Sequence, residues 1–164
     1  MPRNYWLMKS EPDECSFDDL LAAPARTVPW TGVRNYQARN FMRDEMRVGD
    51  GVLFYHSSCA EPGIAGIARV ASRAYPDATQ FDPASEYFDP KARRDAPRWV
   101  HVDVQAVRRV ALIPLAALRA RPELSELAIL RRGNRLSITP VTAPQWDFIT
   151  RVLARPASAR AARG

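Results

Sequence analysis

The stretch that organises this chain is W-T-G-V-R-N-Y-Q-A-R-N, residues 30–40. It places two aromatic rings, two guanidiniums and three carboxamides within eleven residues, a high density of groups that form directional contacts. Because Thr31 and Gly32 interrupt regular structure, we expect Trp30 to end a strand and Val33 to begin a helix. Free N–H groups at such a helix start favour polar or anionic ligands. The stretch therefore predicts a binding site; the alternative is core aromatics beside solvated arginines.

Length and composition indicate one globular domain. The 164 residues are 46% apolar, enough for a sizeable core, and contain no apolar run long enough to cross a membrane. The N-terminus lacks the apolar core of a signal peptide, and Cys15 and Cys59 are too few for a disulfide framework or a zinc site. We expect a single domain over residues 1–154, a disordered basic tail over 155–164, and a bacterial cytoplasmic location.

The charge favours a nucleic-acid partner. The formal net charge is +6, and all but Lys9 and Lys91 of the 24 basic residues are arginine. Arginine binds phosphates bidentately and stacks on flat rings better than lysine does. A basic chain of this kind fits a nucleic-acid-binding protein. A genome rich in G and C is the alternative reason for so many arginines, so the charge alone does not decide the function.

Strand and helix patterns alternate without a repeated unit. Strand patterns cover residues 5–9, 27–30, 52–56, 64–70, 98–110 and 136–138, and helical patterns cover residues 17–23, 34–46, 115–120, 123–130 and 143–153. The continuous apolar run at 52–56 predicts a strand buried on both faces. Ser16 with Asp19, and Thr142 with Gln145, have the spacing of capping boxes. About five or six strands in this mixed order predict an α+β fold, a small twisted β-barrel flanked by helices.

Catalytic chemistry has one candidate. His56 ends a strand beside Ser57 and Cys59, an arrangement that offers a base and a nucleophile. No nucleophile elbow, no convincingly spaced carboxylate pair, no phosphate-binding glycine loop and no set of metal ligands accompanies them. We therefore interpret His56 as a structural or ligand-orienting residue, and we expect no metal and no cofactor.

A recognition pocket is the better-supported alternative, because flat and hydrogen-bonding side chains are both available. The rings are Trp6, Trp30, Tyr36, Tyr55 and Trp99, and the polar groups are Ser10, Asn35, Asn40, His56 and Ser57. Stacking of a base on an aromatic ring contributes roughly 1–3 kcal/mol whatever the base, and polar groups on its edge then discriminate. The competing interpretation is that several of these rings belong to the core.

Several blocks of the sequence resemble the EVE domain family. In order, they are YWLMKSEP (5–12), the central stretch (30–40), FYHS (54–57), GIAGIA (63–68), YPDATQFD (75–82), YFDP (87–90), PRW (97–99) and LRRG (130–133). The resemblance covers nearly everything from residue 5 to 153. It implies a PUA-like fold, related to readers of methylated adenine in RNA, that binds modified bases, notably modified cytosines in DNA, in an aromatic-lined pocket. It also adds Lys9 to the candidate site, while Asn134 is an apparent insertion in the basic turn.

We therefore predict a monomeric, non-catalytic module that binds a modified base in DNA or RNA and acts through a separate effector protein. Trp30 and either Trp99 or Tyr36 are expected to sandwich the base. The edge of the base is assigned to Ser10, Asn35, His56 or Ser57, and the phosphates are assigned to Arg34, Arg39, Arg98 and Arg132. Two alternatives stay open: an enzyme that uses His56 with Ser57 or Cys59, and a sensor of a free nucleoside.

Overall fold

The two central strands come from the apolar runs that begin at Tyr5 and Gly51. In the computed structural model, which describes residues 3–157, β1 (Tyr5–Ser10) and β3 (Gly51–His56) pair in parallel along their whole length. Every residue of β3 except His56 is buried. The predicted burial of this strand on both faces is therefore confirmed.

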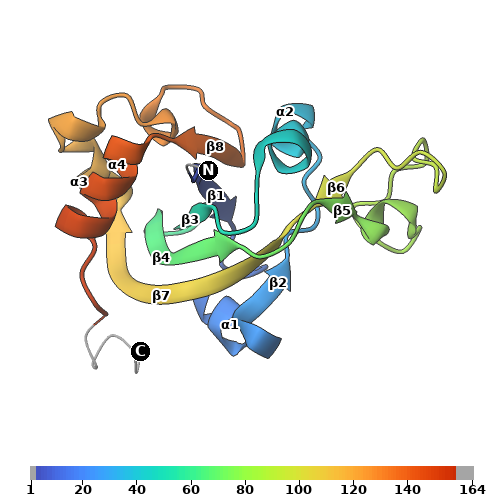
Figure 1. Ribbon diagram of the computed structural model, residues 1–164, viewed down its shortest axis with the longest axis horizontal. Helices are drawn as coiled ribbons and strands as arrows, with labels where there is room; N and C mark the ends of the chain where they lie inside the picture. Colours follow the sequence, from blue (N-terminus) through green and yellow to red (C-terminus); the bar gives the residue numbers. More distant parts are fainter. Residues whose placement is uncertain (1–2, 158–164) are drawn as a thin grey trace.

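A curled six-stranded sheet surrounds this pair (Figure 1). The other strands are β2 (Thr27–Pro29), β4 (Gly63–Val70), β7 (Asp103–Pro114) and β8 (Ile138–Val141), in the order β2-β7-β4-β3-β1-β8. β1 and β3 run parallel, and the other neighbours run antiparallel. The long strand β7 curls around the sheet, and its register with β4 shifts twice. The predicted α+β class, with a small twisted sheet of about five or six strands flanked by helices, is confirmed by this large sheet.

The strand predicted over residues 98–110 is divided between two sheets. β6 (Val100–His101) pairs with β5 (Tyr75–Pro76) in a separate two-stranded sheet, whereas β7 belongs to the large one. Between them the carbonyl of Val102 accepts the N–H of Trp30 at 2.9 Å. The division therefore brings the loop that connects β5 and β6 next to the central stretch.

Short helices and turns cover the sheet and its edges. They are α1 (Phe17–Ala22), α2 (Tyr36–Asn40), α3 (Leu115–Arg119) and α4 (Ala143–Phe148), the π-helical turns η2 (Phe41–Glu45) and η6 (Ile149–Leu153), and the 3₁₀ turns η1 (Pro24–Arg26), η3 (Ala78–Phe81), η4 (Pro122–Leu124) and η5 (Ala128–Leu130). Both capping boxes are confirmed. The Ser16 hydroxyl accepts the Asp19 N–H at 3.0 Å, and the Thr142 hydroxyl accepts the Gln145 N–H at 3.3 Å.

The helix of the central stretch starts later than predicted. Gly32 adopts a φ of +85°, and Asn35 is the N-cap, with its side-chain oxygen accepting the Ala38 N–H at 3.0 Å. Asparagine is a strong N-cap because its side chain satisfies one of the free N–H groups of the first turn. Val33, expected to begin the helix, therefore precedes it and is buried in the core.

The helix predicted over residues 123–130 is wrong. The two 3₁₀ turns η4 and η5 take its place: the N–H groups of Leu127 and Leu130 donate three residues back, to the carbonyls of Leu124 and Leu127. The side chains of Leu124 and Leu127 are both fully buried. The last strand likewise begins at Ile138 instead of Leu136, whose N–H donates to the Asn134 side chain at 3.0 Å.

Alternation along β1 and β3 gives the sheet a core cluster on each face. The buried even-numbered residues of both strands pack with α1 and α2, and the buried odd-numbered residues pack with α3 and η4. At the C-terminal ends of these strands, Ser10 and His56 therefore lie on the α1 side, whereas Lys9 lies on the α3 side. Two separate surfaces meet at this one end of the sheet.

The C-terminal end stays on the sheet as far as residue 156. The Ala111 N–H donates to the Arg155 carbonyl at 2.8 Å, and Pro156 forms a bridge with Val110. The first residues of the predicted tail therefore pair with β7. The rest of that prediction, residues 158–164, lies outside the described residues, and the domain boundary after residue 154 stays a prediction.

Candidate nucleic-acid interface

Trp30 and His56 meet on one buried ring near the end of β3. Trp30 packs edge-on against Phe54, with ring centroids 5.5 Å apart and an interplanar angle of 86°. His56 packs edge-on against the same ring at 5.7 Å. Trp30 is 8% exposed, so only a margin of its ring reaches the surface. The structure therefore brings these two predicted site residues together on the α1 side.

His56 and Ser10 hold the segment that leads from β1 into α1. The Phe17 N–H donates to His56 Nε2 at 3.1 Å, so this nitrogen is an acceptor and the proton of the neutral ring lies on Nδ1. Burial lowers the pKa of His56, and Asp18 opposes this only in part. The Ser10 hydroxyl donates to the Cys15 carbonyl at 2.6 Å. The lone pair that a general base would use is thus already occupied.

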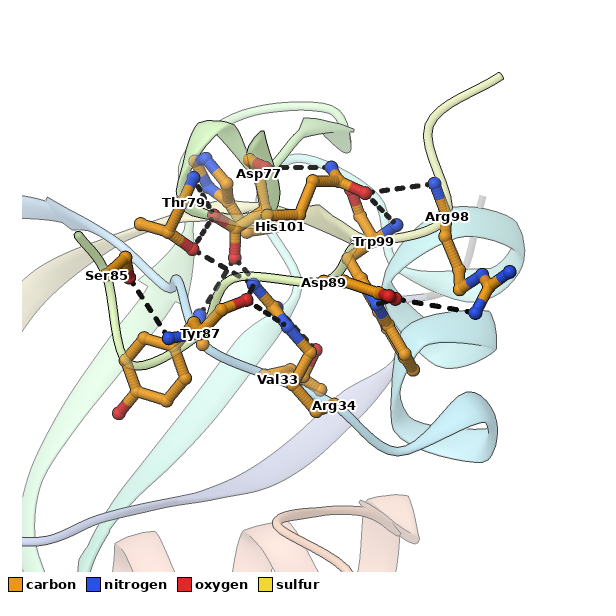
Figure 2. A network of polar contacts seen from close by, with 12 residues as sticks. Val33, Arg34, Asp77, Thr79, Ser85, Tyr87, Asp89, Arg98, Trp99 and His101 are labelled. Atoms are coloured by element: carbon orange, nitrogen blue, oxygen red, sulfur yellow. Dashed lines mark hydrogen bonds and ion pairs between the residues drawn. The ribbon is translucent and has the colours of Figure 1, made fainter. Parts of the chain in front are cut away.

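A set of contacts that we call the loop network, centred on Arg34 with Asp77, Thr79 and Tyr87, ties the central stretch to the β5–β6 loop (Figure 2). The Arg34 guanidinium donates to the Tyr87 carbonyl at 2.8 and 3.1 Å, to the Thr79 hydroxyl at 3.0 Å and to Asp77 Oδ2 at 3.2 Å. A bond to the Val33 carbonyl at 3.0 Å occupies its fifth N–H. Arg34 therefore has no N–H left for a phosphate.

Asp77 is the buried anion of the loop network. It is 0% exposed and also accepts the Gly32 N–H at 2.8 Å and the Thr79 N–H at 2.9 Å. Burial opposes its ionisation, but the hydrogen bonds from Thr79, Gly32 and Arg34 hold the pKa of Asp77 below its ordinary value. Asp77 therefore stays charged and fixes the turn before α2.

Trp99 and Tyr36 form a stacked pair beside this network. Their ring centroids are 4.9 Å apart at an interplanar angle of 25°. The indole N–H of Trp99 donates to Asp89 Oδ2 at 2.8 Å, and the ring is nearly buried, whereas Tyr36 is 52% exposed. The structure thus brings together the two candidates for the second stacking ring, and one covers the other.

Two more predicted phosphate contacts are engaged inside the protein. Arg39 donates to the Asn40 side chain at 2.8 and 3.1 Å and to the Arg98 carbonyl at 3.0 Å, and it lies over the Tyr36 ring at 4.7 Å. Arg98 pairs with Asp89 at 3.4 Å. Together with Arg34, these arginines stabilise the arrangement of α2 and the loop.

The other predicted residues line a cavity of about 380 Å³ on the α3 side, which we call the basic cavity. Lys9, Tyr55, Ser57 and Arg132 contribute to it, together with Arg119, Arg131, Ser58, Asn134, Gly133, Pro62, Leu115 and Ile129. Within residues 3–157, none of its four cations forms an ion pair. Burial without a carboxylate partner lowers the pKa of Lys9.

The basic turn at the mouth of this cavity has a defined conformation. Gly133 adopts a φ of +79°, which favours glycine, and the Asn134 amide donates to the Ala128 carbonyl at 2.7 Å. The apparent insertion at Asn134 therefore connects η5 to the start of β8. It holds Arg131 and Arg132 beside the cavity.

Trp6 lies apart from both surfaces, with its ring N–H donating to buried Asp50 at 3.1 Å. Sequence reasoning missed Asp77, Asp89 and Arg119 as partners of the site. Asp77 and Asp89 lie inside the blocks quoted for the family resemblance, and that resemblance could have identified them, whereas nothing near Arg119 distinguishes it.

Among residues 3–157, no group of three or more His, Cys, Asp or Glu side chains is placed to hold a metal. No helix in that part of the chain is both long and apolar enough to cross a bilayer.

Several known proteins are similar to this chain over most of its length. Residues 4–152 match the EVE domain family. Thymocyte nuclear protein 1 from Homo sapiens is 43% identical, over 89% of this chain and 72% of that protein. The human THYN1 protein in complex with 5-methylcytosine-containing DNA has a TM-score of 0.85 at 43% identity, covering 89% of this chain and 95% of that chain. A Pseudomonas putida protein has a TM-score of 0.83 at 52% identity, covering 89% and 97% of the two chains.

Proposed function

The chain belongs to the EVE domain family, and on this basis we propose that it is a non-catalytic module that reads a modified base, above all a modified cytosine in DNA, flipped into an aromatic-lined pocket. The observation that supports this proposal most is the human relative with a closely similar backbone, whose structure contains 5-methylcytosine DNA. A base leaves the stack before a protein reads its edge, and an aromatic ring replaces part of the lost stacking.

We place the base at the α1-side corner, against the exposed margin of Trp30. Tyr36 is the exposed member of its stack, so the second ring becomes available when Tyr36 swings away from Trp99. The base then takes the place of Tyr36 on the Trp99 face. Stacking on each ring contributes about 1–3 kcal/mol, which offsets part of the unstacking of the duplex.

Polar groups around the corner have the chemistry to read a cytosine edge. His56 Nδ1–H and the Asn35 amide are donors for the ring nitrogen and carbonyl oxygen of the base. The Ser10 oxygen retains a lone pair for the exocyclic amine, because its own proton is donated to Cys15. Ser57 lines the basic cavity on the other face of the sheet, so we do not assign it to the edge of the base.

An enzymatic role for His56 with Ser57 or Cys59 has less support. The Nε2 lone pair is engaged by α1, so proton abstraction there requires this hydrogen bond to break. A free-nucleoside sensor is distinguished from a nucleic-acid reader by comparing the affinity for the free nucleoside with the affinity for an oligonucleotide that contains the same base. A sensor should bind the oligonucleotide no more tightly than the nucleoside.

Fluorescence polarisation with matched oligonucleotides tests the proposal. The probes carry cytosine, 5-methylcytosine, 5-hydroxymethylcytosine, adenine or N6-methyladenine at one position, as DNA and as RNA. We expect one modified cytosine in DNA to bind most tightly, and Trp30→Ala to remove that preference in a protein that still melts cooperatively. Equal binding of all probes contradicts the proposal. If Trp30→Ala unfolds, Tyr36→Ala tests the pocket without removing a core ring: because Tyr36 covers Trp99, this variant should bind the preferred probe more tightly, and weaker binding would contradict the placement of the base.

We further propose that the module acts as a cytoplasmic monomer and passes its signal to a separate effector protein. Its cysteines, Cys15 and Cys59, are both free, which fits a reducing compartment. Sedimentation velocity with and without the preferred oligonucleotide tests the monomer, and a complex of two protein copies would contradict it.

A further inference from the structure

The basic cavity gathers cations that have no anion of their own. Lys9 comes from β1, Arg119 from α3, and Arg131 and Arg132 from the turn before β8. None of them forms an ion pair within the described residues, although Arg34, Arg39 and Arg98 on the other surface have acceptors in the protein. Like charges held together repel one another, so such a cluster favours an anion from outside.

The polar groups of the cavity match a phosphate, and its size exceeds one. Ser57 and Ser58 add hydroxyl donors beside the four cations. Arginine forks and lysine are the usual partners of phosphate oxygens. The volume of about 380 Å³ falls in the range of small-molecule sites, whereas a phosphate alone fills only part of it. Leu115 and Ile129 supply an apolar wall for the remainder of the ligand.

We propose that the basic cavity binds one nucleotide unit, with its phosphate among Lys9, Arg131 and Arg132 and its sugar and base against Leu115 and Ile129. The phosphate ester has two sources: a nucleotide of the bound strand next to the flipped base, or a free nucleotide. The first source rests on the proposed function, and the second does not.

The geometry of β1 favours a nucleotide of the bound strand. Lys9 and Ser10 are adjacent and point to opposite faces of the sheet, Lys9 to the basic cavity and Ser10 to the corner of Trp30. A strand that crosses this end of the sheet places a base on one face and the next nucleotide on the other. The Ser57 N–H donates to the Ser10 carbonyl at 3.0 Å, so the two sides are held in a fixed relation.

Calorimetric titration of the whole chain with cytidine, cytidine 5′-monophosphate and inorganic phosphate at low salt tests the cavity itself. We expect the monophosphate to bind at least tenfold more tightly than cytidine, with inorganic phosphate competing. Arg131→Gln and Arg132→Gln are each expected to weaken the monophosphate about tenfold, because each removes a charge-assisted hydrogen bond. Arg73→Gln, an exposed arginine outside the cavity, is the matched charge control and should change affinity less than twofold. Equal affinity for cytidine and its monophosphate, or equal losses in Arg73→Gln and Arg132→Gln, overturns the proposal.

An oligonucleotide experiment separates the two sources of phosphate. If the cavity holds the bound strand, Arg132→Gln lowers the slope of log affinity against log salt by about one and leaves the preference for the modified base unchanged. If it holds a free nucleotide, the slope stays unchanged while monophosphate binding is lost. A protein without any preference for a modified base would refute the proposed function, but the titration with monophosphate would still decide the cavity.

Discussion

The two surfaces at the C-terminal end of β1 and β3 are both rich in arginine and use it differently. On the α1 side, Arg34 has all five N–H groups bonded inside the protein, and Arg98 is paired with Asp89. On the α3 side, Arg131 and Arg132 line a cavity that contains no carboxylate. Arginines that donate to acceptors inside the protein are not available to bind an external anion. A basic composition therefore indicates an anionic partner only through the arginines that have no such acceptor.

The largest expected effect comes from removing the buried anion of the loop network. Asp77→Ala leaves Arg34, the Gly32 N–H and Thr79 without their shared acceptor, and loss of one partner of a buried ion pair costs about 3–5 kcal/mol. Urea denaturation measures the change. Asp95→Ala is the control, because its ion pair with Arg93 is exposed and contributes at most about 1 kcal/mol. Similar losses in both variants would mean that the loop network is not a structural element.

A crossed pair of variants separates the two surfaces directly. Arg34→Gln should lower the free energy of unfolding by about 1.5–3 kcal/mol, because it removes hydrogen bonds to a charged group. Arg132→Gln should change stability by no more than about 0.5 kcal/mol, as expected for a surface substitution. Oligonucleotide binding should show the reverse order once measured on folded protein. If Arg132→Gln destabilises as much as Arg34→Gln, the basic cavity is structural.

Adding a side chain at Gly32, which packs against Tyr87 of the β5–β6 loop, should give a third, smaller loss of stability. Its φ is +85°, and a Cβ there would lie 2.7 Å from Tyr87 Cζ. Gly32→Ala should therefore destabilise by about 1–3 kcal/mol and displace the Tyr87 ring. Gly49→Ala is the control, because it shares a positive φ but has nothing within 4 Å. Equal losses would assign the cost to backbone strain alone and remove Tyr87 from the explanation.

The smallest effect concerns pH and His56. Burial lowers its pKa in the folded protein below the ordinary 6.5, so the unfolded chain binds the proton first as pH falls. The stability that His56 contributes is therefore complete above about pH 6.5 and is lost as pH drops below it. Urea denaturation at pH 7.5 and at pH 5 gives the loss in free energy of unfolding between these two pH values. This loss should be smaller in His56→Gln than in the original protein, because the glutamine amide does not titrate and its oxygen can still accept the Phe17 N–H. An unchanged decrease would refute this neutral acceptor role.

Local patterns predicted the parts of the molecule that local chemistry determines. The capping boxes at Ser16 and Thr142 and the buried strand β3 follow from neighbouring residues, and the structure confirms them. The start of α2 was misplaced because the interruption expected at Thr31 and Gly32 extends to Asn35, whose side chain caps the helix. Asp77, a residue distant in sequence, accepts the Gly32 N–H and holds the turn that precedes this helix.

The assignment of arginines to phosphates depended on contacts that no local pattern contains. Arg34 and Asp77 are far apart in sequence, and the pairing depends on a loop that reaches back to the central stretch. The aromatic residues were ambiguous for the same reason, since Trp6 and Trp30 are both buried although only Trp30 reaches the candidate corner. Residue type identified the candidates, and the fold divides them between two surfaces.

The central claim is that one surface reads the modified base while the other holds the strand through phosphate. The most direct measurement is the affinity of the protein for two DNA duplexes that differ by one methyl group on cytosine, titrated from 50 to 200 mM salt. We predict two parallel lines of log affinity against log salt, with the methylated duplex bound more tightly throughout, because the phosphate contacts set the slope and the base pocket sets the separation. Coincident lines would contradict the account and leave only a basic surface.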